Sequence, residues 1–188
     1  MPDFDVVTLE STDHVAVGET APDFTRPLVT AEQWADRSLS TLAGGGPTVL
    51  VFTTMAGAFL AEYTLTELRD RNLGITPAAT DASETETAEP TADETVVAVS
   101  ISSPYELSRF LDEKDIPYGV FSDPANGVAE TYGVVHDLDG MEGIAEPRPA
   151  IFVLDDERTV EYVWVASEWP DFPDYDELEA ALDAVRSA

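Results

Sequence analysis

The sequence predicts an α/β fold in which helices cover a central mixed sheet. Two continuous apolar runs, at residues 48–52 and 95–101, are bounded by turn residues and predict buried strands. An amphipathic pattern follows each run, and a later pair of strands precedes a last amphipathic segment. Because strand–helix–strand crossovers are right-handed, the two buried strands are expected to be parallel and adjacent or nearly so.

The first half of the chain yields three elements from local patterns. Residues 17–30 contain prolines and short apolar pieces and predict extended structure. Three glycines and a proline at 44–47 predict a turn before the first buried strand. Residues 58–72 then predict a helix whose inner face carries Leu65 and Leu68.

The second half begins with a helix start signal. Either Ser102 or Ser103 is expected to cap a helix that has Pro104 in its first turn. Gly133 is suited to a helix C-terminal cap. The remaining elements are predicted as a strand at 118–121, a short helix from Asp123 to Gly133, a hairpin of strands 150–154 and 160–165, and a helix at 175–185.

A single domain is expected over residues 17–188, preceded by an acidic lead at residues 1–16. Residues 76–94 interrupt the domain with alanine, threonine, proline and acids, and hold no basic or aromatic side chain. Such a composition buries little apolar area, so we expect an acidic low-complexity surface insert. A solvated spacer is the main interpretation of this insert, and a partner-binding segment is the alternative.

The chain carries 38 acidic and 9 basic side chains, with a net charge of -29, and Lys114 is its one lysine. This charge excludes binding to nucleic acid or to an anionic membrane. Self-repulsion strains such a fold in dilute buffer, but at molar salt the screening length falls to about 3 Å. We therefore expect a protein of an extreme halophile, with an ordinary acidic protein as the alternative.

The chain has no cysteine, which excludes disulfides, thiolate metal sites and every cysteine nucleophile. The acids between His136 and Glu142 lack the spacing of a calcium-binding loop, so we expect neither a metal nor a cofactor. No run of about 18 apolar residues and no signal sequence is visible, so a cytoplasmic location is expected.

Five segments in the correct order resemble the peroxiredoxin family (alkyl hydroperoxide reductase/thiol-specific antioxidant) of the thioredoxin-fold superfamily. They are VGETAPDF at 17–24, the strand at 49–52, VAVSISSP at 97–104, the segment 118–134 with SDP and TYGV, and RPAIFVLD at 148–155. The resemblance covers residues 17–187 apart from the insert and is closest to the bacterioferritin-comigratory type. It implies a thioredoxin-like, peroxiredoxin-type three-layer sandwich.

In that family a thiolate attacks the peroxide O–O bond from a P-x-x-x-T-x-x-C motif at the start of the first long helix. A helix N-terminus and an arginine from a later strand lower the thiol pKa. The threonine hydroxyl, backbone N–H groups and the arginine hold the two oxygens of the peroxide. An alignment anchored on Gly57 and Glu62 gives Phe52 at the proline, Ala56 at the threonine and Phe59 at the cysteine, whereas a shift by one residue gives Ala58 or Leu60 at the cysteine.

Arg148 alone remains of the four chemical positions, with Glu62 as its expected charge neighbour. A phenylalanine cannot attack peroxide, and we expect Phe59 to fill the former pocket, where burial is worth about 2 kcal/mol. Arg148 either pairs with Glu62 or another acid, or binds an anionic ligand at the helix N-terminus. The sequence leaves open whether the bond from Arg148 to Pro149 is cis or trans.

Three functions are compatible with these residues. The first is a non-catalytic binding or regulatory protein that acts on a protein partner or as a homo-oligomer through peroxiredoxin-type surfaces. The second is the thiol-type antioxidant oxidoreductase that the resemblance implies, and the third is a structural subunit of a larger assembly. The missing cysteine favours the first. The aromatic residues near 164–175 are read as core packing, with a partner-binding patch as the alternative.

Overall fold

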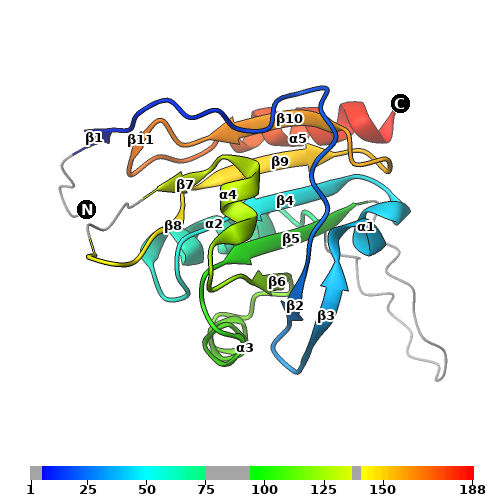
Figure 1. Ribbon diagram of the computed structural model, residues 1–188. Helices are drawn as coiled ribbons and strands as arrows, with labels where there is room; N and C mark the ends of the chain where they lie inside the picture. Colours follow the sequence, from blue (N-terminus) through cyan, green and yellow to red (C-terminus); the bar gives the residue numbers. More distant parts are fainter. Residues whose placement is uncertain (1–5, 75–93, 137–140) are drawn as a thin grey trace, which may run out of the picture.

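The computed structural model describes residues 6–74, 94–136 and 141–188. The predicted insert, apart from Glu94, and the acids at 137–139 lie outside these ranges. The described chain forms three layers, with helices on both faces of a central sheet (Figure 1). The predicted fold class is therefore confirmed.

The central sheet has seven strands and mixed directions. Its strands are β2 (Thr25–Val29), β3 (Trp34–Ser38), β4 (Thr48–Phe52), β5 (Thr95–Ser100), β6 (Gly119–Ser122), β9 (Ala150–Leu154) and β10 (Val160–Val165). They lie in the order β10-β9-β4-β5-β6-β2-β3. The pairs β4–β5 and β5–β6 are parallel and the others are antiparallel. The predicted parallel neighbours at 48–52 and 95–101 are thus adjacent.

Two short strand pairs and six helical segments complete the described chain. The pairs are β1 (Val7–Thr8) with β11 (Glu168–Trp169) and β7 (Val135–His136) with β8 (Glu146–Pro147). The helices are α1 (Leu39–Leu42), the 3-10 turn η1 (Ala43–Gly45), α2 (Phe59–Asp70), α3 (Pro104–Glu113), α4 (Gly127–Tyr132) and α5 (Tyr175–Arg186).

The sheet separates two hydrophobic cores. On one face α2, α3 and α5 pack over a cluster that includes Leu65, Leu107 and Leu178. On the other face α4 packs over a cluster that includes Phe52 and Tyr132 (Figure 1). Strands β4 and β9 are buried along their full length, because they face both cores. This explains why their sequences are continuous apolar runs without alternation.

The helix ends follow the predicted capping chemistry, except that α4 begins later in the chain than predicted. Ser103 is the N-cap of α3 and forms a capping box with Glu106. Helix α4 begins at Gly127 and not at Asp123, because the Asp123 carboxylate instead accepts the N–H of Val128 at 2.7 Å and the Nε–H of Arg26 at 2.8 Å. Gly133 is the C-cap of α4, as predicted, with φ +72°.

Residues 6–16 run along the domain and are hydrogen-bonded to it. The N–H of Leu9 donates to the Ser167 carbonyl at 2.9 Å, and the N–H of Val15 donates to the Tyr132 carbonyl at 3.1 Å. A Cβ at Gly133 would lie 2.3 Å from the carbonyl oxygen of Asp13, so glycine is required where this segment crosses α4.

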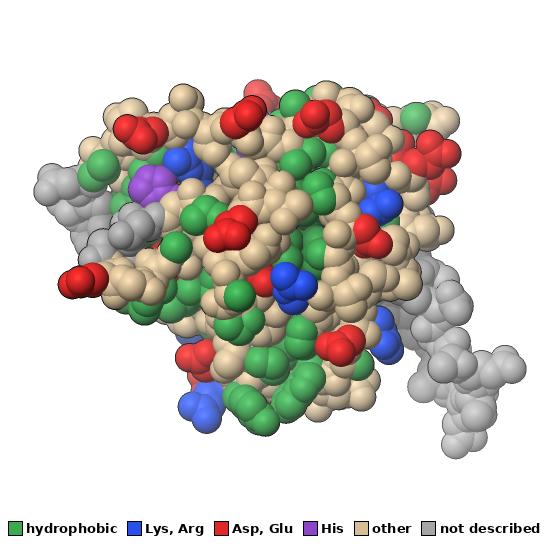
Figure 2. Space-filling view, viewed as in Figure 1, with side chains coloured by type: hydrophobic (Ala, Val, Ile, Leu, Met, Phe, Trp, Pro, Cys, Tyr) green, Lys and Arg blue, Asp and Glu red, His purple; other side chains and the backbone are tan. Residues whose placement is uncertain are grey.

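On the face drawn in Figure 2, acidic side chains are scattered and outnumber the basic ones. Six basic residues pair with carboxylates within 4.0 Å, namely Arg26, Arg69, Arg71, Lys114, Arg158 and Arg186. Within residues 6–74, 94–136 and 141–188, no helix has the length and apolar character needed to cross a membrane.

Candidate functional site

The candidate site is the loop from Thr53 to Ala58 that joins β4 to α2. The loop leaves the carboxyl end of β4, turns at Gly57 with φ +87°, and enters α2 at Ala58, the N-cap. The Ala58 N–H donates to the Met55 carbonyl at 3.0 Å and closes this turn. Alanine has no side-chain oxygen, so α2 begins without a side-chain cap.

Buried polar side chains fix this loop from beneath. The N–H of Ala56 donates to the Ser102 hydroxyl at 2.9 Å, and the N–H of Met55 donates to the Glu146 carboxylate at 3.2 Å. The Ser100 hydroxyl donates to the Thr54 carbonyl at 3.1 Å. The backbone N–H groups of Met55, Ala56 and Ala58 are therefore already bonded to oxygens of the chain itself.

Phe59 is the first residue of α2 and lies on the surface, with 58% of its area exposed. Its ring lies 5.8 Å from that of Tyr63, one helical turn on, and 6.4 Å from that of Phe172, between ring centroids. The expectation that Phe59 fills a pocket is wrong, because its place on the helix points it away from the sheet. Leu60 and Ala61 form the inner side of the first turn and are buried.

The other two residues of the predicted motif do not converge with Phe59. Phe52 is buried in the core on the α4 side of the sheet, where its ring lies 5.0 Å from that of Tyr132. Ala56 is half-buried and packs against the core on the α2 side. The positions that the alignment assigned to proline, threonine and cysteine therefore lie in three different environments.

Arg148 lies between β8 and β9 and is 4% exposed. Its Nη1 donates to the Glu10 carbonyl at 2.7 Å and to the Ala166 carbonyl at 3.3 Å. Burial lowers the pKa of Arg148, and the charge of Glu10 opposes this effect. The guanidinium thus ties the N-terminal segment to the end of β10, and the bond to Pro149 is trans.

The predicted pairing of Arg148 with Glu62 is not formed. The Glu62 carboxylate instead accepts a hydrogen bond from Lys114 Nζ at 3.0 Å, between α2 and the end of α3. The sequence could not indicate these partners of Arg148, because they are backbone carbonyls, which any residue type can supply.

Two cavities in the described part of the chain lie away from this loop. A cavity of about 1030 Å³ is lined by the glycines before β4, the acidic turn of the β9–β10 hairpin and the end of α5. A small cavity of about 40 Å³ lies beside Phe24 and Thr131. Neither is lined by residues 53–62 or by Arg148. Across the described ranges, no three histidine or acidic side chains gather as metal ligands.

Comparisons with known proteins agree with this fold. The AhpC/TSA family model matches residues 76–163. The crystal structure of peroxidoxin BcpB from Mycobacterium tuberculosis is similar, with a TM-score of 0.69 and 23% identity over 93% of this chain and 98% of that one. The reduced 2-Cys peroxiredoxin of Plasmodium vivax gives a TM-score of 0.70 and 17% identity, over 91% and 96% of the two chains. No curated protein matches the sequence. The peroxiredoxin-type fold and the predicted resemblance are thus confirmed.

Proposed function

We propose that this protein is a non-catalytic binding or regulatory protein on a peroxiredoxin-type scaffold. The observation that carries the proposal is the complete absence of cysteine from the sequence. No alignment of the motif supplies a thiolate, and the Met55 thioether, which peroxide can oxidise to a sulfoxide, does not turn over without a dedicated reductase. An antioxidant oxidoreductase, the alternative from the resemblance, has no nucleophile here.

The loop geometry supports the same conclusion. Peroxide chemistry needs donors that are aimed at the ligand and are not already used. Here Met55 and Ala56 donate to Glu146 and Ser102, and Arg148 donates to two carbonyl groups. The 4% exposure of Arg148 also weighs against the binding of an anionic ligand from solvent.

The burial of the loop favours a revised alignment of the motif. If the motif ends at Ala61, Thr54 takes the proline position and Ala58 takes the threonine position. Thr54 and Ala61 are each 1% exposed, as expected of residues that face the sheet, whereas Phe59 is 58% exposed. We therefore infer that Ala61 occupies the place of the nucleophile.

Two further parts of the proposal rest on composition. The net charge of -29 and the single lysine indicate a halophile. We propose that the protein acts in the cytoplasm. It would bind a protein partner, or a second copy of the chain, through a peroxiredoxin-type surface.

The experiment is a hydrogen peroxide assay of the full-length chain with dithiothreitol as reductant. Consumption should equal that of buffer at every protein concentration. A rate that rises in proportion to protein concentration would refute a non-catalytic role. A cysteine-containing peroxiredoxin assayed in the same buffer is the positive control.

A further inference from the structure

Three aromatic side chains form an exposed cluster at the start of α2. Phe59 and Tyr63 come from the first two turns of α2, and Phe172 comes from the segment before α5. Their exposed fractions are 58%, 39% and 38%. The rings of Tyr63 and Phe172 pack edge to face at 4.8 Å between centroids. We call these three residues the aromatic ridge.

The size of the aromatic ridge limits what it can bind. An aromatic side chain carries about 150–250 Å² of surface, so the exposed fractions amount to roughly 250–300 Å². A stable interface between folded proteins buries about 800 Å² on each partner. The ridge is therefore too small to hold a second folded domain by itself, and it fits the side chains of one short segment.

Acidic side chains lie on one side of the aromatic ridge, next to Phe172. Residues 159–185, which include Phe172 and α5 up to its last residue, Arg186, hold eight acidic side chains and no lysine or arginine. The half-buried Asp171 directly precedes Phe172, and the exposed Asp174 follows it two residues on. The Asp171 carboxylate accepts the N–H groups of Ser167 and Phe172, and Asp174 caps α5, so both carboxylates are held in place beside the ridge.

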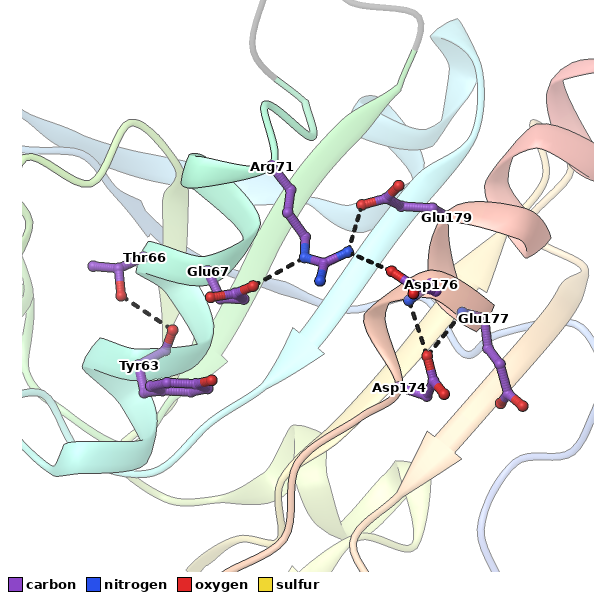
Figure 3. Close-up of polar contacts among 8 residues, drawn as sticks. All are labelled: Tyr63, Thr66, Glu67, Arg71, Asp174, Asp176, Glu177 and Glu179. Carbon is purple, nitrogen blue, oxygen red and sulfur yellow. Dashed lines mark hydrogen bonds and ion pairs between the residues drawn. The ribbon is translucent and has the colours of Figure 1, made fainter. Parts of the chain in front are cut away.

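Arg71, at the opposite end of α2 from the aromatic ridge, gives an internal example of an arginine held by a ring and carboxylates (Figure 3). Its guanidinium lies 5.1 Å from the centroid of the Tyr175 ring. It also bonds three carboxylates, those of Glu67, Asp176 and Glu179, at 2.9 Å each. The hydrogen bond to Asp176, followed by those to Glu179 and Glu67, raises the pKa of Arg71. An arginine between α2 and α5 is thus held by an aromatic face and carboxylates together.

We propose that the aromatic ridge binds a short cationic segment of a partner protein, whose arginine side chains lie on the rings and pair with Asp171 and Asp174. Charge complementarity selects this occupant, because the carboxylates of Asp171 and Asp174 lie beside Phe172 in a chain with 38 acids against 9 bases. The inference rests on the proposed binding role and names the surface and the chemical class of the partner.

The test is a fluorescence anisotropy titration of a labelled decapeptide of alternating arginine and leucine with the full-length chain at physiological ionic strength. The wild-type protein should bind it in a saturable way, and Phe172→Ala should weaken binding about tenfold. Phe172→Ala leaves the net charge unchanged, so non-specific attraction of a basic peptide to an acidic protein would be the same in both. Tyr105→Ala, at an exposed aromatic residue that pairs with Trp34 instead, is the matched control and should bind like the wild type.

Four results would overturn the inference. The first is binding that does not saturate up to about 1 mM peptide, and the second is equal binding of a peptide with glutamate in place of arginine. The third is an equal loss of peptide affinity in Phe172→Ala and Tyr105→Ala. The fourth is an unchanged peptide affinity in Phe172→Ala. Sedimentation equilibrium adds a fifth, because a dimer that Phe172→Ala dissociates would make a second copy the occupant. Failure of peptide binding with no peroxide consumption refutes this inference alone, whereas peroxide turnover refutes the proposed function.

Discussion

Glu94 connects three parts of the chain, and Glu94→Gln should lower the free energy of unfolding by about 2 kcal/mol. One carboxylate oxygen accepts the N–H of Gly74 at 2.7 Å. The other accepts the Nε–H of Arg186 at 3.1 Å and a second donor of the same guanidinium. Because Glu94 is 6% exposed, water cannot replace these bonds after the substitution.

The magnitude follows from what glutamine keeps and what it loses. Glutamine has the same shape and an oxygen for the Gly74 N–H, but it has no charge to face Arg186. A hydrogen bond to a charged group is worth about 1.5–3 kcal/mol net. The Arg186 side chain is 31% exposed and keeps its bond to Asp183, so the lower part of this range applies. For a chain of this length, 2 kcal/mol corresponds to a fall in Tm of about 4–8 °C.

Urea unfolding followed by tryptophan fluorescence measures this change. Asp183→Asn is the matched control, since it also removes one acid that binds Arg186, but the Asp183 side chain is 71% exposed and should contribute less than about 0.5 kcal/mol. The control also corrects for the relief of self-repulsion in a chain of charge -29. Equal effects of the two substitutions would refute the argument from burial.

Three other outcomes are expected. Raising KCl from about 0.1 M to about 3 M should raise Tm, because screening removes repulsion among the acids; the same Tm at both concentrations would contradict the halophile assignment. Ala58→Ser supplies the missing cap of α2 and should add about 1 kcal/mol to the free energy of unfolding in urea, and no change would mean that the first N–H groups of α2 need no acceptor. The N–H and hydroxyl of Ser103 lower the pKa of Glu106, so the stabilisation from this carboxylate is complete above about pH 4.3 and is lost as the pH falls through the lowered pKa. The destabilisation by Glu106→Gln in urea should therefore shrink in acid, and a constant difference across this range would contradict the assignment.

The fold was predictable where burial leaves a pattern in the sequence. Strands β4, β5 and β9 face two cores, so their apolar runs identify them. Ser103 was predicted as one of two candidate caps because its hydroxyl has a specific hydrogen-bonding role at a helix start. In both cases one residue type has a direct physical reason to occupy its position.

The hairpin of β2 and β3 was not predicted, for a physical reason. Strand β3 has the sequence WADRS and lies at the edge of the sheet, with four of its five residues exposed. An exposed edge strand does not need alternating apolar residues, and charged side chains protect it from pairing with other chains. Its structure comes from backbone pairing with β2, which does not depend on residue type.

The candidate site was only partly predictable, since its location followed from chain order and its contacts did not. Sequence order placed the loop between β4 and α2. The burial of Phe59 was mispredicted because the apolar residues at the motif positions were expected to fill the former pocket, whereas Phe59 forms an exposed surface with Tyr63 and Phe172. The partners of Arg148 are carbonyls of residues 10 and 166, and any residue type could supply them.

These contacts imply that adding a thiol would not by itself restore peroxide chemistry. Ala61→Cys places sulfur in the buried first turn of α2, and Phe59→Cys places it at the exposed position. Residue 59 is the first residue of α2 and is exposed, whereas residue 61 lies in the apolar core, so hydrogen peroxide should oxidise the thiol of Phe59→Cys to a sulfenate faster than that of Ala61→Cys. Neither variant should approach the turnover of a peroxiredoxin, because the N–H groups of Met55 and Ala56 remain bonded to the chain. Mass spectrometry of the oxidised thiol measures the rate of oxidation at each position, and peroxide consumption measures the turnover of each variant. Faster oxidation at residue 61 would contradict the argument from burial, and full turnover in either variant would mean that the loop donors are free to exchange their partners for peroxide.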